Sequence, residues 1–227
     1  NAILLKRLIK GVAREMGMIA TFMAKPYAQQ AGSGTHIHIS ILNKNKNNIF
    51  SDPLNEIGSI ILQHAIGGLS KTMKESMAIF CPNANSYRRF QPDLYVPMAP
   101  TWGIDNRTVA IRIPAGPEKA KRIEHRVSGA DANPYLVLAS ILAGIHYGMA
   151  QKIEPPKIST GDAILKHKPS LPMTWVESLD AFSKSKILKK YFGKEFCHVY
   201  YKTKYKEMKK FDSHITPLEL DWYLRTV

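Results

Sequence analysis

The spacing of apolar residues along the chain predicts three main helices. From Leu4 to Met16, apolar residues recur at the helical period with Lys and Arg on the other side, and Gly17 is a natural stop. Residues 61–77 follow the same period and predict a second helix that ends before Pro82. The stretch 132–151 carries no charged residue, but polar residues, Gly and Pro interrupt it. We therefore interpret it as a buried core helix and not as a membrane span.

Alternation of apolar and polar residues predicts four strands. The run 18–25 is ended by Pro26, and the run 35–42 alternates strictly, which turns His36, His38 and Ser40 to one face. Two further runs, 107–113 and 122–127, follow a long irregular stretch from Cys81 to Asn106. Such a stretch inside a compact domain is typical of a functional loop.

The rest of the chain is predicted to be helical. Thr174 with Glu177, and Thr216 with Glu219, form the pattern of a capping box, and Pro217 suits a first helical position. Ten Lys residues fall between Lys184 and Lys210, interleaved with tyrosines. They favour either a nucleic-acid-binding surface or a solvated helix face whose tyrosines pack inward, and we prefer the second interpretation.

Composition and charge narrow the class of protein. The 227 residues are 44% hydrophobic and 22% charged, which is typical of one globular domain or a domain with an appendage. The formal net charge is +14, an excess that usually points to anionic partners. Two cysteines are too few for a disulfide framework, and no leader opens the chain, so we expect a reducing, cytoplasmic location without membrane insertion.

Charged residues in four segments suggest phosphate chemistry. Alternation places Arg122, Glu124 and Arg126 on one face of their strand, opposite Ile123, His125 and Val127. Convergence with the other segments would combine guanidinium groups that bind phosphate with imidazole and carboxylate groups that can hold a divalent cation. The alternatives are surface decoration for the strand and hydrogen bonding in the core for the histidines. The residues on the other segments are Arg107, Arg112, Arg88, Arg89, His36 and His38.

Four blocks in the same order and spacing resemble the glutamine synthetase family. They are GSGTHIHIS from Gly32, NSYRRFQP from Asn85, WGIDNRTVAIRIP from Trp102, and RIEHR followed by ADANPYLVLASILAG. The resemblance implies an α+β fold in which antiparallel strands form part of an open barrel packed with helices, with a helical C-terminal region. It also implies an ATP-dependent ligase that phosphorylates the γ-carboxylate of glutamate and lets an amine displace the phosphate.

The resemblance assigns a role to each matching position. His36 and Glu124 are implied as ligands of Mg²⁺ or Mn²⁺, and His38, Ser40, Arg112 and Arg122 as ATP-binding residues. Gly32, Arg89 and Arg126 fall where the family binds glutamate. Arg107 falls where positive charge stabilises the transferring phosphoryl group, and we expect Arg107 and Arg89 to be the catalytic residues.

Two departures from the family pattern bear on the acceptor. Ala31 stands where the family usually has Asn, and Tyr95 stands where it has a Glu that helps to form the ammonium pocket. Other blocks, such as TFMAKPY and DSHITPLELDWYL, resemble the γ-glutamylpolyamine (γ-glutamylputrescine) synthetase branch. We therefore expect a polyamine such as putrescine as acceptor, with ammonia as the alternative.

The family resemblance also predicts how much of an enzyme the chain contains. Residues 1–227 are expected to be a partial catalytic domain, without the small N-terminal domain and the first catalytic strands, and to have little or no ligase activity alone. The complete protein is expected to be a homo-oligomeric ring. A basic nucleic-acid-binding module is the alternative from another class. A pseudoenzyme is disfavoured because the candidate site residues occur together.

Overall fold

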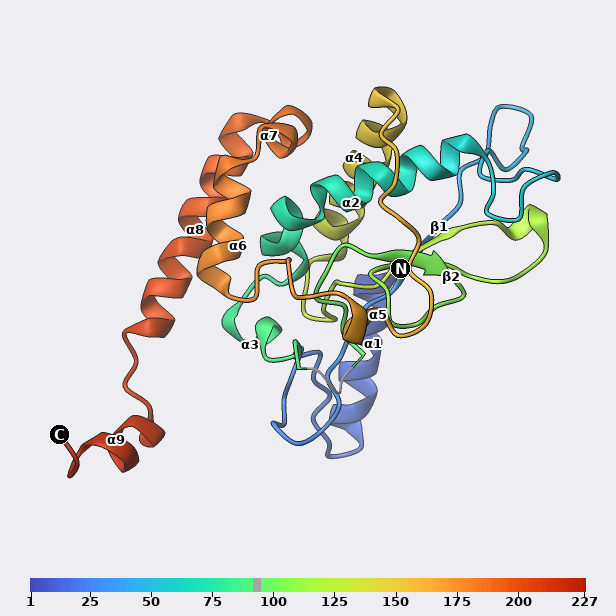
Figure 1. The fold of residues 1–227 in the computed structure, drawn as a ribbon. Coiled ribbons are helices and arrows are strands. Elements are labelled where there is room, and N and C mark those ends of the chain that lie inside the picture. Colours follow the sequence, from blue (N-terminus) through green and yellow to red (C-terminus); the bar gives the residue numbers. More distant parts are fainter. Residues whose placement is uncertain (92–94) are drawn as a thin grey trace.

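The computed structural model describes residues 1–91 and 95–227, and it combines one small sheet with a group of helices (Figure 1). The elements, in chain order, are α1 (Ala2–Glu15), β1 (Ile37–Ile39), α2 (Ile60–Phe80), α3 (Ala84–Tyr87), β2 (Trp102–Ile104), β3 (Ile111–Ile113), a 3-10 turn (Glu118–Ala120), β4 (Ile123–His125), α4 (Pro134–Gln151), α5 (Ala163–Lys166), α6 (Trp175–Lys184), α7 (Lys186–Phe192), α8 (Lys194–Asp212) and α9 (Pro217–Tyr223).

The sheet has the strand order β1-β4-β3-β2 and is not closed into a barrel. Strand β4 pairs antiparallel with β1 and with β3, which places His38 and Arg112 as the partners of Glu124 on either side. Strand β2 pairs parallel with β3, so the sheet is mixed. The family resemblance had implied antiparallel strands. The expected α+β class with helices packed on an open sheet is confirmed.

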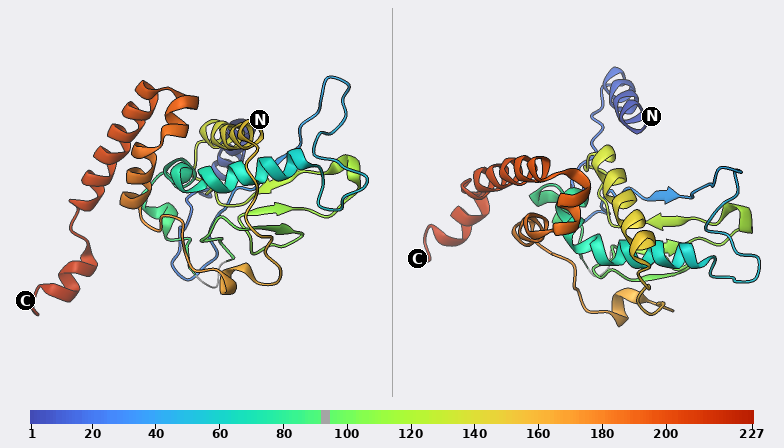
Figure 2. Two further views of the ribbon diagram at one scale, coloured as in Figure 1. Left: turned by 45° about the horizontal axis from the view of Figure 1, so that its top comes forward. Right: turned by 90° about the horizontal axis from the view of Figure 1, so that it is seen from above.

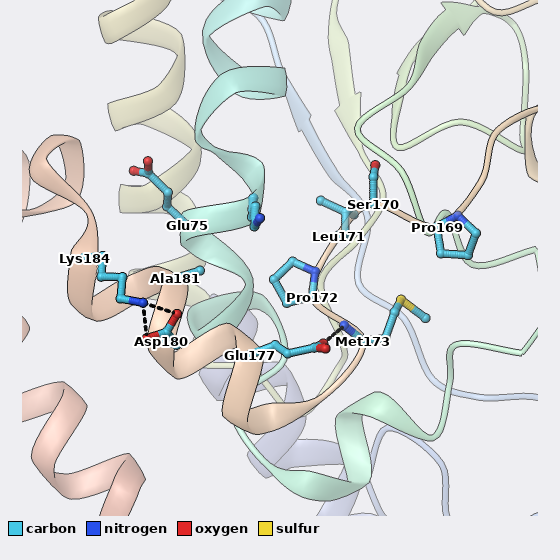
Figure 3. Close-up of a pocket in the computed structure, with 11 residues that line it drawn as sticks. Glu75, Pro169, Ser170, Leu171, Pro172, Met173, Glu177, Asp180, Ala181 and Lys184 are labelled. Atoms are coloured by element: carbon cyan, nitrogen blue, oxygen red, sulfur yellow. Dashed lines mark hydrogen bonds and ion pairs between the residues drawn. The ribbon is translucent and has the colours of Figure 1, made fainter.

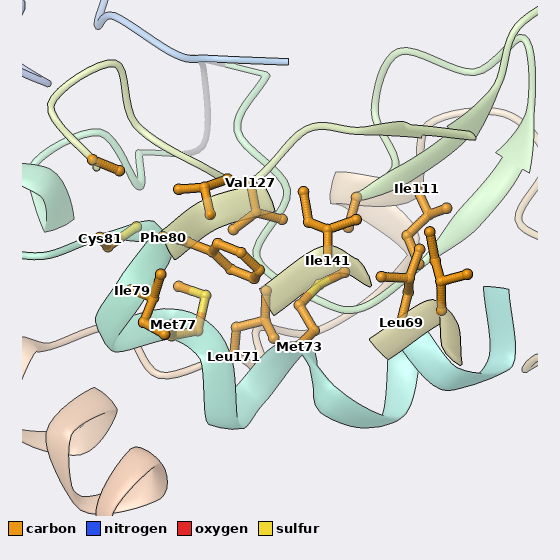
Figure 4. Packing of buried hydrophobic residues seen from close by; sticks show 14 of the residues in the cluster. Leu69, Met73, Met77, Ile79, Phe80, Cys81, Ile111, Val127, Ile141 and Leu171 are labelled. Atoms are coloured by element: carbon orange, nitrogen blue, oxygen red, sulfur yellow. The ribbon is translucent and has the colours of Figure 1, made fainter. Parts of the chain in front are cut away.

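One face of the sheet is buried against helices α2 and α4. Ile111 and Val127 meet Leu69, Met73 and Ile141 there in one continuous apolar cluster (Figure 4). The two helices approach very closely at Gly68, where an added Cβ would lie 2.2 Å from the carbonyl oxygen of Gly144. The absence of a side chain at Gly68 permits this approach. This packing leaves the opposite face of the sheet, with His36, His38 and Glu124, for polar chemistry.

Helices α6 and α7 pack against α2, α8 packs against α6 and α7, and α9 lies at the end of this arm (Figures 1 and 2). Both predicted capping boxes, at Thr174 and Thr216, are present. Tyr200 packs inward and donates a hydrogen bond to the Ala78 carbonyl oxygen at 2.8 Å, whereas Tyr205 stays exposed. The inward packing predicted for the tyrosines of the Lys-rich helix therefore holds for Tyr200 and not for Tyr205.

Helix α1 projects from the rest of the chain in the right view of Figure 2, and none of its residues is buried. The amphipathic helix expected from Leu4 to Met16 is therefore present with its apolar side exposed. Within residues 1–91 and 95–227, no helix combines the length and the apolarity that crossing a membrane requires. The core helix α4 agrees with the sequence prediction for residues 132–151.

The strand predicted for residues 18–25 is wrong, because this segment is irregular. Its end is fixed by the Asn85 side chain, which accepts a hydrogen bond from the Lys25 amide and donates one to the Lys25 carbonyl oxygen, both at 2.8 Å. The other strands are shorter than their predicted runs. The stretch 81–106 contains α3 and β2, and Pro92, the last residue of the NSYRRFQP block, lies outside the described residues.

Candidate active site

Glu124, on the central strand β4, is the centre of the candidate site. The residue is only 2% exposed, and three nitrogen-bearing side chains surround its carboxylate. Arg112 Nη1 donates to Oε2 at 2.8 Å, Arg126 Nη1 donates to Oε1 at 2.5 Å, and His36 Nδ1 lies 3.1 Å from Oε1. Residues from three separate sequence blocks therefore converge on one carboxylate.

The charges around Glu124 favour the forms of the side chains that can bind a cation. Burial raises the pKa of Glu124, but hydrogen bonds and positive charge from Arg112 and Arg126 outweigh it and hold the pKa below its ordinary value. Burial and the nearby Arg126 charge lower the pKa of His36. At neutral pH the carboxylate is thus ionised, and the imidazole is neutral.

His36 and Glu124 supply two ligands of the kinds that divalent cations accept, and the His36 side chain is 43% exposed. Within the described part of the chain, no group of three or more His, Cys, Asp or Glu side chains is placed to hold a metal ion. The Glu124 carboxylate fits Mg²⁺ bound together with a nucleotide, since this ion usually takes one or two protein carboxylates and completes its shell with phosphate oxygens and water, and His36 would add a nitrogen ligand beside it.

Arg126 connects the centre of the site to Arg107. Its Nη2 donates to the Arg107 carbonyl oxygen at 3.0 Å, while its Nη1 lies 3.4 Å from His36 Nδ1. Arg107 itself is exposed, on the turn between β2 and β3. This turn lines a cavity of about 560 Å³ together with residues 158–162. The Arg107 side chain therefore stands at an open edge of the site.

Arg112 lies opposite Glu124 on β3, and Arg122 lies two residues before Glu124 in the same segment. Arg112 bridges two carboxylates, because its Nη1 binds Glu124 and its Nη2 pairs with Asp105. Arg122 Nε donates to His38 Nδ1 at 3.2 Å. Ser40 lies exposed just beyond β1. The four residues predicted to bind ATP therefore belong to the same region of the sheet, on the face opposite α2 and α4 or at the end of β1.

Arg89 and Gly32 are brought together, but the guanidinium of Arg89 is buried. The residue is 2% exposed, and Nη2 donates to the Val127 carbonyl oxygen at 3.0 Å. A Cβ added at Gly32 would lie 2.9 Å from Arg89 Cγ, so the absence of a side chain lets the main chain cross directly over Arg89. Nη1 of Arg89 has no hydrogen-bond partner among the described residues. Neighbouring Arg88 is exposed and does not join the site.

Two carboxylates near the site were missed by sequence reasoning. Asp105 pairs with Arg112, and Asp131 accepts hydrogen bonds from Asn83 Nδ2 at 2.8 Å and Ser86 Oγ at 2.6 Å. Asp105 has a backbone φ of 44°, a conformation that Asp tolerates better than most residues. Its position directly before Asn-Arg in WGIDNR was the available signal.

A larger cavity lies elsewhere, between α2, α6 and the loop before α6 (Figure 3). It measures about 760 Å³, and none of the predicted site residues lines it. Three of its charged groups have structural partners: Asp180 pairs with Lys184 at 2.7 Å, and Glu177 accepts from the Met173 amide at 2.9 Å. Cavity size alone therefore does not identify the chemistry of this chain.

Comparison with known proteins agrees with the arrangement on the sheet. The family model "Glutamine synthetase, catalytic domain" matches residues 1–223. Gamma-glutamylputrescine synthetase PuuA of Escherichia coli (strain K12) is 44% identical over 225 residues, which cover 99% of this chain and 48% of that protein. Glutamate–isopropylamine ligase of a Pseudomonas species is 36% identical, over 99% of this chain and 50% of that protein.

A solved structure has the same fold. The structure described as "GmaS/ADP complex-Conformation 1" matches with a TM-score of 0.88 and 28% identity, over 98% of this chain and 53% of that chain. This chain thus spans about half the length of the curated relatives it matches. Because the family model covers nearly all of its residues, the chain belongs to the glutamine synthetase catalytic-domain family.

Proposed function

We propose that this chain carries the nucleotide-binding and phosphoryl-transfer part of an ATP-dependent ligase that forms γ-glutamyl amides. The observation that carries the proposal is the convergence of Arg112, Arg126 and His36 on the buried carboxylate of Glu124. The relatives support it, since they are named as ligases that join glutamate to putrescine or isopropylamine, and as glutamine synthetases.

The proposed reaction has two steps. In the first, a γ-carboxylate oxygen of glutamate attacks the γ-phosphorus of ATP, which forms γ-glutamyl phosphate and releases ADP. In the second, the amine nitrogen attacks the carbonyl carbon, phosphate leaves, and the amine loses a proton to give the amide. Such chemistry needs positioning and neutralisation of charge more than covalent help from the protein.

The residues on the sheet would supply both requirements. Mg²⁺ or Mn²⁺, held by His36 and Glu124, would neutralise charge on the phosphate oxygens. Arg112 and Arg122, with His38 and Ser40, would hold ATP, and exposed Arg107 would stabilise charge on the transferring phosphoryl group. Arg126, Arg89 and Gly32 would form the glutamate side, where a substrate carboxylate could supply the partner that Arg89 Nη1 lacks among the described residues.

An organic amine, for example putrescine, is the proposed acceptor. Tyr95 supports this proposal, because it stands where the family carries a Glu of the ammonium pocket, and 66% of Tyr95 is exposed. The relatives named for putrescine, isopropylamine and ethanolamine ligation point the same way. Ammonia is the alternative acceptor, and a homo-oligomeric ring in the cytoplasm is the proposed state of the complete protein.

A coupled assay of ADP release on the full-length protein tests the function. We expect release that requires both glutamate and an amine, with putrescine a better substrate than ammonia, and a large loss of rate on Arg107→Gln. Residues 1–227 assayed alone should show little or no turnover, since they match only about half the length of the related ligases. ADP release that ignores glutamate would contradict the ligase proposal, and a preference for ammonia would reverse the choice of acceptor.

A further inference from the structure

The turn that carries Arg107 is fixed from both sides by the side chain of Asn106. Asn106 Oδ1 accepts from the Thr108 amide at 2.9 Å and from the Thr108 hydroxyl at 2.6 Å. Its Nδ2 donates to the carbonyl oxygens of Gly161, at 2.7 Å, and Ser159, at 3.4 Å. One amide group thus closes the turn around Arg107 and joins it to a distant part of the chain.

The distant part, residues 156–163, is itself fastened to strand β2. Trp102 Nε1 donates to the Pro156 carbonyl oxygen at 2.6 Å, and the Ser159 amide donates to the Trp102 carbonyl oxygen at 2.9 Å. Gly103 permits the close approach, because a Cβ there would lie 2.7 Å from the Ser159 oxygen. The Ala163 amide completes the junction by donating to Thr108 Oγ1 at 2.8 Å.

The side chain of Arg107 has no such anchor of its own. It is exposed, and no hydrogen bond or ion pair of its guanidinium is found within residues 1–91 and 95–227. Its main chain, by contrast, is held at the carbonyl oxygen by Arg126 Nη2. The position of the Arg107 guanidinium therefore depends on the backbone of the turn, and Asn106 holds that backbone together with Arg126.

We propose that Asn106 is a positioning residue: by tying the Arg107 turn to residues 156–163 it sets Arg107 for the phosphoryl-transfer step. This inference rests on the ligase function proposed above. It predicts that loss of Asn106 lowers the rate of phosphoryl transfer more than the affinity for the nucleotide, because misplacement of a catalytic group by about 1 Å can cost roughly 10²-fold in rate.

The first arm of the test measures the turn itself and needs no activity. Amide hydrogen exchange, followed residue by residue by NMR, is compared between the wild type, Asn106→Ala and Asn106→Asp. Asn106→Ala should speed exchange at Thr108 and Ala163 roughly fivefold, the value of one hydrogen bond of about 1 kcal/mol. Asn106→Asp keeps an acceptor for Thr108 but loses the donor to the carbonyl oxygens of Ser159 and Gly161. Exchange at the Thr108 amide should therefore stay slow, and exchange at the amides of residues 159–161 should become faster. Asn45→Ala, on an exposed loop, is the matched control.

The second arm measures catalysis in the full-length enzyme. Asn106→Ala should lower kcat for glutamate-dependent ADP release roughly 10²-fold while KM for ATP stays within about threefold, and Asn106→Asp should recover part of kcat. Partial unfolding alone would also lower the apparent kcat without changing KM, so kcat is expressed per folded molecule, with the folded fraction of each variant measured by circular dichroism under the assay conditions; a merely structural role would then leave kcat per folded molecule unchanged.

The outcomes separate this inference from the proposed function. Unchanged exchange at Thr108 in Asn106→Ala would overturn the claim that Asn106 fixes the turn. Faster exchange with an unchanged kcat would overturn its catalytic role. Absence of glutamate-dependent ADP release in the wild type would instead overturn the ligase proposal and, with it, the catalytic part of this inference, while the exchange arm still decides the structural part.

Discussion

Replacing Glu124 by Gln should destabilise the folded chain strongly. The substitution keeps one carbonyl oxygen but removes the negative charge that Arg112 and Arg126 share, and it directs an NH₂ group at a guanidinium. Arg112 keeps Asp105 as a partner, whereas Arg126, 8% exposed, keeps the Arg107 carbonyl oxygen. Removing one partner of a buried ion pair typically costs about 3–5 kcal/mol, and because both arginines keep another contact we expect a loss of about 3 kcal/mol in the free energy of unfolding.

Urea unfolding at neutral pH measures this cost against a matched control, Glu56→Gln, whose residue is exposed on a loop. The double variant Glu124→Gln/Arg126→Met removes the stranded cation as well. It should therefore be more stable than the sum of the single losses predicts, by about 1–3 kcal/mol.

The pH dependence gives the sign of the charge effect. Because the folded-state pKa of Glu124 is lowered, its contribution is complete above the unfolded-state pKa of about 4.3 and is lost as pH falls through the folded value. The wild type should lose this contribution in acid, and Glu124→Gln should not. A variant as stable as Glu56→Gln, or strict additivity in the double variant, would refute the reasoning.

Two further predictions concern the core. Gly148→Ala should destabilise the chain by about 3 kcal/mol in urea unfolding, because the added Cβ would lie 2.1 Å from the His64 carbonyl oxygen. The control Gly11→Ala, whose Cβ would have nothing within 4 Å, should be neutral or slightly stabilising. Equal effects of the two substitutions would contradict this prediction. Burial lowers the pKa of His125 to about 3, so below about pH 6.5 the unfolded chain binds a proton that the folded chain does not. The free energy of unfolding should therefore fall by up to about 1.4 kcal/mol per pH unit. His125→Gln should flatten that fall in unfolding measured down to about pH 5, and an unchanged slope would contradict this.

Alternation along the chain predicted the strands that have one buried face. Ile123 and Val127 pack against the helices while Glu124 faces His36, as the pattern of residues 122–127 indicates. Register is well specified in such strands, since a slip of one residue would expose the apolar side chains. The same kind of pattern misled us at residues 18–25, because the contact with Asn85 that shapes their end comes from 60 residues away.

The residue types of the site could be predicted, but their partners could not. Three of the four sequence blocks named the residues that gather around Glu124, and the sheet register explains why they meet. The burial of Arg89 beneath Gly32 depends on the path of the main chain, which local patterns do not encode. The bonds of Asn106 reach 53 and 55 residues along the chain, and the pairing of Asp105 with Arg112 depends on an unusual backbone angle.

The central claim is that His36 and Glu124 together hold a divalent cation that carries a nucleotide. Electron paramagnetic resonance of Mn²⁺, titrated with this chain and ADP, counts the bound ion directly. We predict Mn²⁺ binding that depends on ADP, weakened roughly tenfold or more by His36→Ala or Glu124→Gln and unchanged by His198→Ala, a variant at an exposed histidine on α8. Equal Mn²⁺ binding by all four proteins, or none by the wild type, would contradict the account.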